Sequence, residues 1–278
     1  MGKTIHKEGK MRGIEGTSLF YQTWQPEKIS RIFCVAHGVG EHSGRYMNLV
    51  HYFLPLNYAV YALDHRGHGR SGGQRGHVKQ FSHYVDDFRI FVQLVKEAHP
   101  GIDIFIVGHS MGGLIALAYC LEYPATLKGA IISSPGLAIK VKVPAIKQAA
   151  GKLCSSILPW LAMANGLPVE ALSHDKDVIE QYKADPLVHD RVTARWFTEF
   201  LATQDYVLDS AKRFKLPVLI MHAGEDGLAD PDGSRLFYKK LQIEDKELKI
   251  YEGFYHELFN EISKSKVFDD MKAWLERH

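Results

Sequence analysis

Cysteine is scarce in this chain of 278 residues, which holds only Cys34, Cys120 and Cys154. These residues lie in apolar segments, they show neither metal-site nor redox-motif spacing, and their number is odd. Such a pattern is typical of buried, reduced thiols. The composition therefore argues against a disulfide-stabilised secreted domain and predicts a cytoplasmic protein.

Long hydrophobic runs and a strong net charge are also missing. No apolar segment approaches the roughly 20 residues that cross a bilayer, and residues 1–16 lack the apolar core of a secretory signal. The formal net charge is only +2, and the basic residues form no long stripe, which argues against a nucleic-acid partner. The sequence does not specify an oligomeric state.

The fifteen histidines raise the question of a metal site, but their spacing does not support one. The close pair His65 and His68 has no third ligand at a helical or strand spacing. We predict that both are loop histidines that make hydrogen bonds, and that the protein uses neither a metal ion nor a cofactor.

Short apolar, β-branched runs alternate with amphipathic helical patterns along most of the chain. Most of these runs are nearly continuous in apolar character, as expected for a parallel sheet that is covered on both faces. The alternation predicts an α/β fold whose mostly parallel central sheet is flanked by helices. Predicted strands span 31–38, 58–65, 102–110, 127–136, 216–224 and 247–253; predicted helices include 83–98 and 114–124; and 17–25 is predicted to be an antiparallel edge strand.

The alternation stops after residue 136 and resumes near residue 191. We therefore predict a core of residues 1–136 and 191–278, with residues 137–190 inserted into it. Apolar residues at helical spacing form a stripe in the insertion, and Pro159 is expected to break that helix. Two structures explain the stripe equally well. It can belong to a helix that packs on the domain beneath, or to a lid whose apolar face lines the substrate entrance and touches a membrane. The stripe consists of Ile146, Ala149, Ala150, Leu153, Ile157, Trp160 and Leu161.

The motif GHSMG, residues 108–112, directly follows a predicted strand and opens a predicted helix. Its two glycines let strand and helix pass close together, and the sharp turn exposes the serine hydroxyl near the positive end of the helix. This is the context of a nucleophile elbow. We predict that Ser110 is a catalytic nucleophile rather than part of a plain turn.

The order of residues along the chain selects a general base for Ser110. In this fold the serine is followed first by an acid, after the next-to-last strand, and then by a histidine. Beyond residue 226 the chain holds His256 and the terminal His278, which is expected to fray. His256 follows the last predicted strand and is the predicted base.

The acid remains open between two neighbours, because Glu225 and Asp226 both lie at the end of the strand at 216–224. The shorter side chain gives Asp226 only a slight advantage. Asp230 is followed by Pro231 and a helical pattern, which predicts a helix N-cap instead of a catalytic acid.

An oxyanion hole in this fold uses two backbone amides, one of them directly after the nucleophile. That residue is Met111. The second amide belongs to the loop after an early strand, and HGVG at residues 37–40 offers the Val39 N–H between two glycines. We predict that the amides of Val39 and Met111 form the oxyanion hole.

Four parts of the chain resemble the monoacylglycerol lipases and lysophospholipases of the α/β-hydrolase superfamily. The resemblance implies the α/β-hydrolase fold, with residues 137–190 as a helical cap inserted after the sixth strand of that fold. It also implies that Asp226, rather than Glu225, is the acid that serves Ser110 and His256. The matching segments are HGVGEHSGRY (37–46), LDHRGHGRSGG (63–73), GHSMGG (108–113) and LPVLIMHAGEDGLAD with IYEGFYHE (216–230 and 250–257).

The resemblance further implies a polar chamber for the alcohol head of a substrate and an acyl tunnel beneath the cap. Glu41 and Arg45 occupy motif positions near the head, and we predict that Ile157 and Leu161 contact the substrate from the cap. Many of these lipases carry a second histidine three residues after the base, where this chain has Phe259. That difference argues against a head-group hydrogen bond from this position.

We therefore predict a serine hydrolase of single-chain acyl esters, foremost monoacylglycerols, which releases glycerol and a fatty acid through an acyl-enzyme. Its partner is a lipid-like small molecule, and its cap is predicted to touch membrane surfaces. A lysophospholipase or a general carboxylesterase would use the same triad. A non-catalytic binding protein of the same fold is the alternative from a different class.

Overall fold

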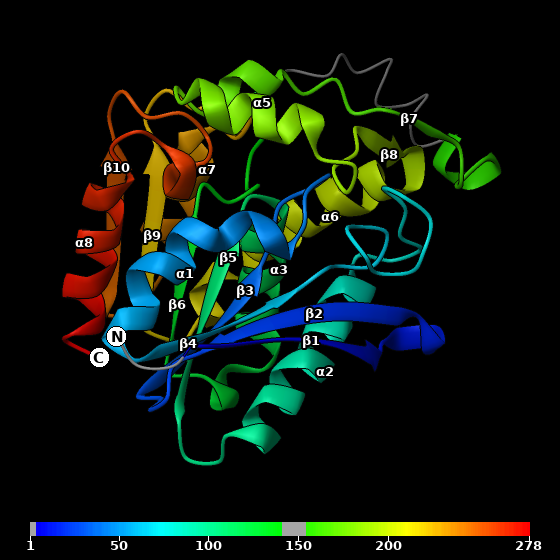
Figure 1. The fold of residues 1–278 in the computed structure, drawn as a ribbon. Helices are drawn as coiled ribbons and strands as arrows, with labels where there is room; N and C mark the ends of the chain where they lie inside the picture. Colours follow the sequence, from blue (N-terminus) through cyan, green and yellow to red (C-terminus); the bar gives the residue numbers. More distant parts are fainter. Residues whose placement is uncertain (1–3, 141–153) are drawn as a thin grey trace.

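One eight-stranded sheet forms the centre of the protein in a computed structural model, which describes residues 4–140 and 154–278. The strand order is β1-β2-β4-β3-β5-β6-β9-β10, and β2 is antiparallel to both of its neighbours, whereas all other neighbours are parallel (Figure 1). The predicted α/β fold with a mostly parallel sheet is confirmed. The strands are β1 (Ile5–Arg12), β2 (Ser18–Gln25), β3 (Arg31–Ala36), β4 (Tyr58–Leu63), β5 (Asp103–His109), β6 (Gly129–Ser133), β9 (Val218–Ala223) and β10 (Lys246–Tyr251).

Helices cover both faces of this sheet. Ile32 and Cys34 of β3 belong to one apolar core and Phe33 and Val35 to the other, because successive side chains of a strand point to opposite faces. None of the described helices is long and apolar enough to span a bilayer. The first core includes residues of α2 (Ser82–Ala98), α3 (Met111–Glu122), α6 (Ala194–Ser210) and α7 (Pro231–Lys240), and the second includes residues of α1 (Met47–Phe53) and α8 (Lys264–Leu275).

The antiparallel edge of the sheet differs from the prediction. The segment predicted as the edge forms β2, but β2 lies between β1 and β4, and β1 is the edge strand. β1 pairs along its whole length, from Ile5 opposite Gln25 to Arg12 opposite Ser18. Its side chains are mostly polar and exposed. Backbone pairing with β2, together with the stacking of His6 on Trp24, holds a strand that has no apolar alternation in its sequence.

The predicted cap of α7 is confirmed. Asp230 accepts a hydrogen bond from the Asp232 amide at 3.1 Å, and Pro231 occupies the first turn of the helix. Proline has no amide hydrogen to lose at this position, and its fixed φ suits the start of a helix. Asp230 therefore caps a helix and is not the catalytic acid.

The insertion between β6 and α6 contains short elements that lie beyond the carboxyl ends of the parallel strands, at the top of Figure 1. Two short strands, β7 (Ala162–Ala164) and β8 (Arg191–Thr193), pair antiparallel across the predicted domain boundary at residue 190. Between them lie a 3-10 turn, η5 (Val169–Ala171), and the helix α5 (Lys176–Ala184).

The predicted apolar stripe of the insertion lies only partly within the described chain. Ile146, Ala149, Ala150 and Leu153 fall outside the described residues. Residues 154–157 are helical, and the helix ends before Pro159, as the proline predicts.

Close backbone contacts fix the junction of β5, α3 and β3. A Cβ atom added at Gly112 would lie 2.0 Å from the carbonyl oxygen of Ala36, and one added at Gly108 would lie 2.6 Å from that of Gly112. No side chain fits at such distances, so glycine is required at both positions for the chain to pass this closely.

We expect Gly112→Ala to lower the free energy of unfolding by about 3 kcal/mol or more, because backbone must move to admit the methyl group. Gly101→Ala is the matched control, since φ there is +83° and nothing lies within 4 Å of the added atom. The control should lose only the backbone penalty of about 1–2 kcal/mol. Urea unfolding of the three proteins measures both losses, and equal losses would contradict the steric argument.

Candidate active site

Ser110 occupies the turn between β5 and α3 in a strained backbone conformation, with φ 54° and ψ −119°. Such a conformation costs about 1–3 kcal/mol and persists only where the surroundings hold it. Here the Ser110 amide donates to the carbonyl of Ser133 at 3.1 Å, and the Ser110 carbonyl accepts from the Gly136 amide at 2.9 Å. The turn leaves the Ser110 side chain partly exposed in a cavity.

A buried acid–base pair lies at the same end of the sheet. His256 follows β10, Asp226 follows β9, and His256 Nδ1 lies 2.7 Å from Asp226 Oδ2. Their side chains are 5% and 0% exposed. Of the two carboxylates that the sequence leaves open, the structure brings Asp226 to His256, whereas Glu225 is exposed to solvent.

Both carboxylate oxygens of Asp226 have hydrogen-bonding partners. Oδ1 accepts the amides of Leu228 at 2.8 Å and Ala229 at 2.9 Å. Oδ2 lies 3.3 Å from Nε2 of the fully buried His222, in addition to its contact with His256. These contacts stabilise the ionised form and fix the direction in which Asp226 points.

The charges of the site oppose the effects of burial. Burial alone would raise the pKa of Asp226, but the charge of His256 and the hydrogen bonds from His222 and His256 hold it well below its ordinary value. Burial alone would lower the pKa of His256, but Asp226 outweighs it and raises this pKa, with Glu257 and Glu41 acting in the same direction. Asp226 is therefore ionised at neutral pH and favours a proton on the imidazole.

His109 adds an uncharged neighbour, with its ring centroid 4.7 Å from that of His256. Burial, together with the nearby His256, lowers the pKa of His109 to about 4. His109 therefore stays neutral in the pH range in which His256 changes its charge.

The predicted oxyanion loop lies directly against Ser110. A Cβ atom added at Gly38 would be 3.2 Å from Cβ of Ser110 and 2.9 Å from Oε1 of Glu41. The Gly38 amide donates to that Glu41 oxygen at 2.6 Å, which fixes the start of the loop. Val39 lines the cavity beside Ser110, and Met111 opens α3 as the residue after the serine.

The cavity has a volume of about 460 Å³, a size typical of small-molecule sites. Ser110 and His256 line it, together with Val39 and Glu41, and the insertion adds the polar side chains of Asn165, Lys183, Asp185, His189 and Asp190. Most of its other lining is apolar and comes from the insertion, α6 and the loop after β9. The apolar part includes Leu167, Val169, Leu172, Val188, Val192, Trp196, Phe197, Phe200 and Leu228.

The remaining residues predicted to bind substrate lie in different surroundings. Glu41 lines the cavity, whereas Arg45 lies behind its wall and binds Glu41 and Glu257. Ile157 and Leu161 are 61% and 48% exposed and do not line the cavity. In the structure, the apolar wall is made by other residues of the insertion.

Several residues that shape the site are not among those predicted from the sequence. Glu257 lines the cavity next to His256, and Trp196 and Phe200 form apolar wall from α6. A charged residue directly after the predicted base was a signal that could have identified Glu257. No comparable signal distinguished Trp196 and Phe200 from ordinary core residues, because their helical spacing serves both purposes.

The histidines of the loop after β4 are buried rather than surface residues. His68 Nδ1 lies 3.0 Å from the Arg66 carbonyl oxygen, as the predicted hydrogen bonding requires. The prediction is wrong for His65, whose ring nitrogens have no hydrogen-bond partner in the described chain and whose ring packs 4.4 Å from that of His37. Within residues 4–140 and 154–278, no cluster of His, Cys, Asp or Glu could hold a metal ion.

Most of the chain matches the model of one known protein family. The model of the serine aminopeptidase S33 family, Hydrolase_4, matches residues 27–263. The chain belongs to this family of serine hydrolases. The match covers the predicted nucleophile, acid, base and oxyanion loop.

Individual relatives within this family are similar over their full length. The "Monoacylglycerol lipase" of Mycolicibacterium smegmatis is 35% identical, and the alignment covers 100% of both chains. The "Phospholipase YtpA" of Bacillus subtilis is 31% identical over 92% of this chain and 99% of its own. A solved structure of a monoglyceride lipase from Saccharomyces cerevisiae superposes with a TM-score of 0.87 at 27% identity, covering 97% of this chain and 94% of the other.

We expect the pKa of the His256 imidazole to be raised in wild type and to fall in Asp226→Asn. The substitution removes the carboxylate that favours the protonated ring and leaves the burial that disfavours it. NMR titration of the imidazole resonances measures this change. Glu225→Gln, at the exposed neighbouring carboxylate, should leave the titration where it is, and equal shifts in both variants would contradict the assignment.

Proposed function

We propose that this protein is a serine hydrolase of single-chain acyl esters and that its main substrates are monoacylglycerols. One observation carries the proposal: a strained serine and the histidine of a buried Asp–His pair line the same cavity, whose wall is mostly apolar. A monoacylglycerol consists of a polar glycerol head and an apolar acyl chain. The polar residues that line the cavity suit the head, and its apolar wall suits the chain.

Acylation begins at Ser110. His256 takes the proton of the hydroxyl as Oγ attacks the ester carbonyl, and the Asp226 carboxylate fixes the tautomer and stabilises the imidazolium that forms. The raised pKa of His256 supports this role, because a more basic imidazole accepts the Ser110 proton more readily.

The tetrahedral intermediate places a negative charge on the former carbonyl oxygen. The amides of Val39 and Met111 donate to this oxyanion, and the closeness of the Gly38 loop to Ser110 supports that assignment. Glycerol then leaves with the proton held by His256. Water activated by the same imidazole attacks the acyl-enzyme and releases the fatty acid.

Residues 137–190 act as the cap of this enzyme. The cavity wall supports this assignment, since Leu167, Val169 and Leu172 of the insertion face the same space as Ser110. An acyl chain lies along this wall and along the aromatic rings of Trp196 and Phe200 on α6. Burial of each methylene contributes about 0.8 kcal/mol, which favours long chains over short ones.

The polar head of the substrate faces Glu41 and Glu257. Phe259 stands at the position where related lipases often have a second histidine, and it is buried against Phe268 with ring centroids 5.7 Å apart. The carboxylates of Glu41 and Glu257 line the cavity beside the head group, with their oxygens held by Arg45, Tyr46, Asn260 and the Gly38 amide. Carboxylates accept hydrogen bonds from free hydroxyl groups, and they disfavour a phosphate in the same place.

Replacement of the nucleophile is the direct test of this chemistry. We expect Ser110→Ala to lower kcat for monoolein by roughly 10⁴- to 10⁶-fold, because no other group can form the acyl-enzyme. A fluorophosphonate probe should label wild-type protein at Ser110 alone. Ser82→Ala, which changes an exposed serine on α2, should keep full activity and labelling.

Retained hydrolysis in Ser110→Ala, or labelling of a different residue, would exclude the proposed mechanism. The head group is tested with the same wild-type protein by comparing kcat/KM for monoolein, lysophosphatidylcholine and a short nitrophenyl ester. If kcat/KM is highest for lysophosphatidylcholine, the protein is a lysophospholipase. If it is highest for the short nitrophenyl ester, the protein is a general carboxylesterase.

The outer part of the insertion makes contact with lipid surfaces. Five large apolar side chains that lie within residues 157–163 are exposed, and this concentration supports a membrane-facing patch. We call these residues the outer apolar patch: Ile157 is 61% exposed, Leu158 42%, Trp160 58%, Leu161 48% and Met163 50%.

We expect the double variant Ile157→Ser, Leu161→Ser to bind phosphatidylcholine vesicles about tenfold or more weakly than wild type, since each apolar side chain buried in lipid contributes about 1.5–3 kcal/mol. Co-sedimentation with vesicles measures the partition. Leu236→Ser is the control, because Leu236 is an equally large apolar residue on α7, 42% exposed and outside the patch. Equal weakening in both variants would exclude the patch as the contact.

A further inference from the structure

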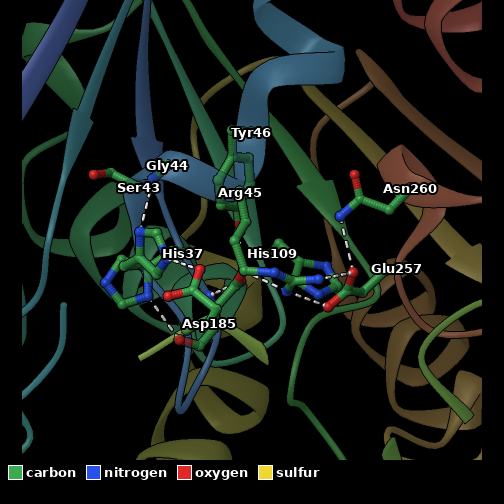
Figure 2. Close-up of polar contacts among 12 residues, drawn as sticks. His37, Ser43, Gly44, Arg45, Tyr46, His109, Asp185, Glu257 and Asn260 are labelled. Carbon is green, nitrogen blue, oxygen red and sulfur yellow. Dashed lines mark hydrogen bonds and ion pairs between the residues drawn. The ribbon is translucent and has the colours of Figure 1, made fainter. Parts of the chain in front are cut away.

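A nearly buried arginine joins two loops of the site. The Arg45 side chain is only 10% exposed. Its guanidinium donates to Glu257 through two nitrogens, at 2.5 Å and 2.8 Å, and to Oε2 of Glu41 at 3.0 Å (Figure 2). The ring of Tyr182 from α5 lies 4.6 Å from the same group. We call Arg45, Glu41 and Glu257 the arginine clamp.

One carboxylate of the clamp organises the oxyanion loop. Oε1 of Glu41 accepts the Gly38 amide at 2.6 Å and the Tyr46 hydroxyl at 2.8 Å, while Oε2 binds Arg45. Both oxygens of Glu41 are therefore bound, and Arg45 holds its pKa at about 2 against the effect of burial. The loop that carries Val39 is attached to Arg45 through this carboxylate.

The other carboxylate belongs to the residue directly after the proposed base. Besides its two bonds to Arg45, Glu257 accepts from Nδ2 of Asn260 at 2.8 Å (Figure 2). Its amide donates to the Leu172 carbonyl of the insertion at 2.8 Å, next to a bond of 3.3 Å from the His256 amide to Ala171. Because His256 and Glu257 are adjacent in the chain, the contacts that hold Glu257 also restrain the backbone that carries the imidazole.

We propose that Arg45 and Glu257 are positioning residues, whose bidentate pair holds the loop of His256 at a fixed place relative to the oxyanion loop over Ser110. This inference rests on the proposed function, because it assigns His256 and Val39 their parts in ester hydrolysis. Arg45 does not line the cavity, so it acts through Glu41 and Glu257 rather than by touching substrate.

The geometry of an arginine suits this task better than that of a lysine. A guanidinium presents several donors in one plane and binds a carboxylate through two parallel bonds, whereas an ammonium is a single point charge on a flexible stem. The second bond to Glu257 fixes an orientation as well as a distance. Catalysis is sensitive to such placement, since a displacement of about 1 Å can lower turnover by about 100-fold.

The first experiment separates positioning from substrate binding. We expect Glu257→Gln and Arg45→Lys each to lower kcat by about 10- to 100-fold. KM for a short nitrophenyl ester, whose small alcohol makes little use of the head site, should change by less than about threefold. Titration with a fluorophosphonate counts the folded active sites, so that turnover is expressed per competent enzyme.

The chain offers a matched control for the loss of a buried pair. Arg66 binds Asp87 with Nε at 2.6 Å and NH2 at 2.9 Å, and neither residue lines the cavity. Asp87→Asn removes one charge from a buried bidentate pair, as Glu257→Gln does. We expect Asp87→Asn to lower the melting temperature with kcat unchanged, and an equal fall of kcat in both variants would overturn the proposal.

The pH dependence adds a readout that a purely structural pair would not move. His256 is faced by the carboxylates of Asp226, Glu257 and Glu41 and by the neutral ring of His109. Loss of the Glu257 charge leaves the protonated imidazole less favoured. The acid limb of kcat/KM should therefore move to lower pH in Glu257→Gln, and it should stay in place in Asp87→Asn.

A double variant and an NMR titration complete the test. Arg45→Lys combined with Glu257→Gln should be about as slow as the slower single variant, because both remove the same pair, and fully multiplied losses would overturn the proposal. Absence of turnover in wild type would refute the proposed function instead. In that case the NMR titration of the His256 imidazole still tests the positioning role of Arg45 and Glu257. An unchanged titration in Glu257→Gln would refute that role.

Discussion

A charge that folding removes from water must find its partners inside the protein, because desolvation costs several kcal/mol for each ion. At this site the requirement ties together segments that lie far apart along the chain. Asp226 receives two amides and two imidazoles, and Arg45 is neutralised by Glu41 and Glu257. Each carboxylate in turn orients a loop that carries a group of the proposed reaction. The same pairing that offsets desolvation thus determines the shape of the site.

The parallel sheet decides which loops can meet in this way. The strands β3, β5, β9 and β10 all end at one edge, and the residues just beyond these ends are Val39, Ser110, Asp226 and His256. Such an edge collects side chains from segments that are distant in sequence and holds each of them on a rigid strand end. The tight packing around Gly112 keeps the central junction of this edge in place.

Much of this arrangement could be predicted from the sequence, since apolar strands repeat along the chain and GHSMG stands between a strand and a helix. The choice between Glu225 and Asp226 could not be made from residue types, because it depends on a turn in which Asp226 accepts the amides of Leu228 and Ala229. β1 escaped prediction because its side chains are mostly polar and exposed, so that no apolar alternation marks the strand. The bond between Arg45 and Glu257 joins positions that no local periodicity relates.

The insertion has an inner and an outer part that make different contacts. Its inner part gives the backbone carbonyls of Ala171 and Leu172 to the amides of His256 and Glu257, and so it supports the loop of the base. Its outer part, residues 157–163, presents apolar side chains to the surroundings. Under the proposed membrane contact, changes confined to the outer part alter that contact and leave the support of the base intact. A graft that replaced the whole insertion would also have to supply those two carbonyl groups, or the recipient would lose the support of its base.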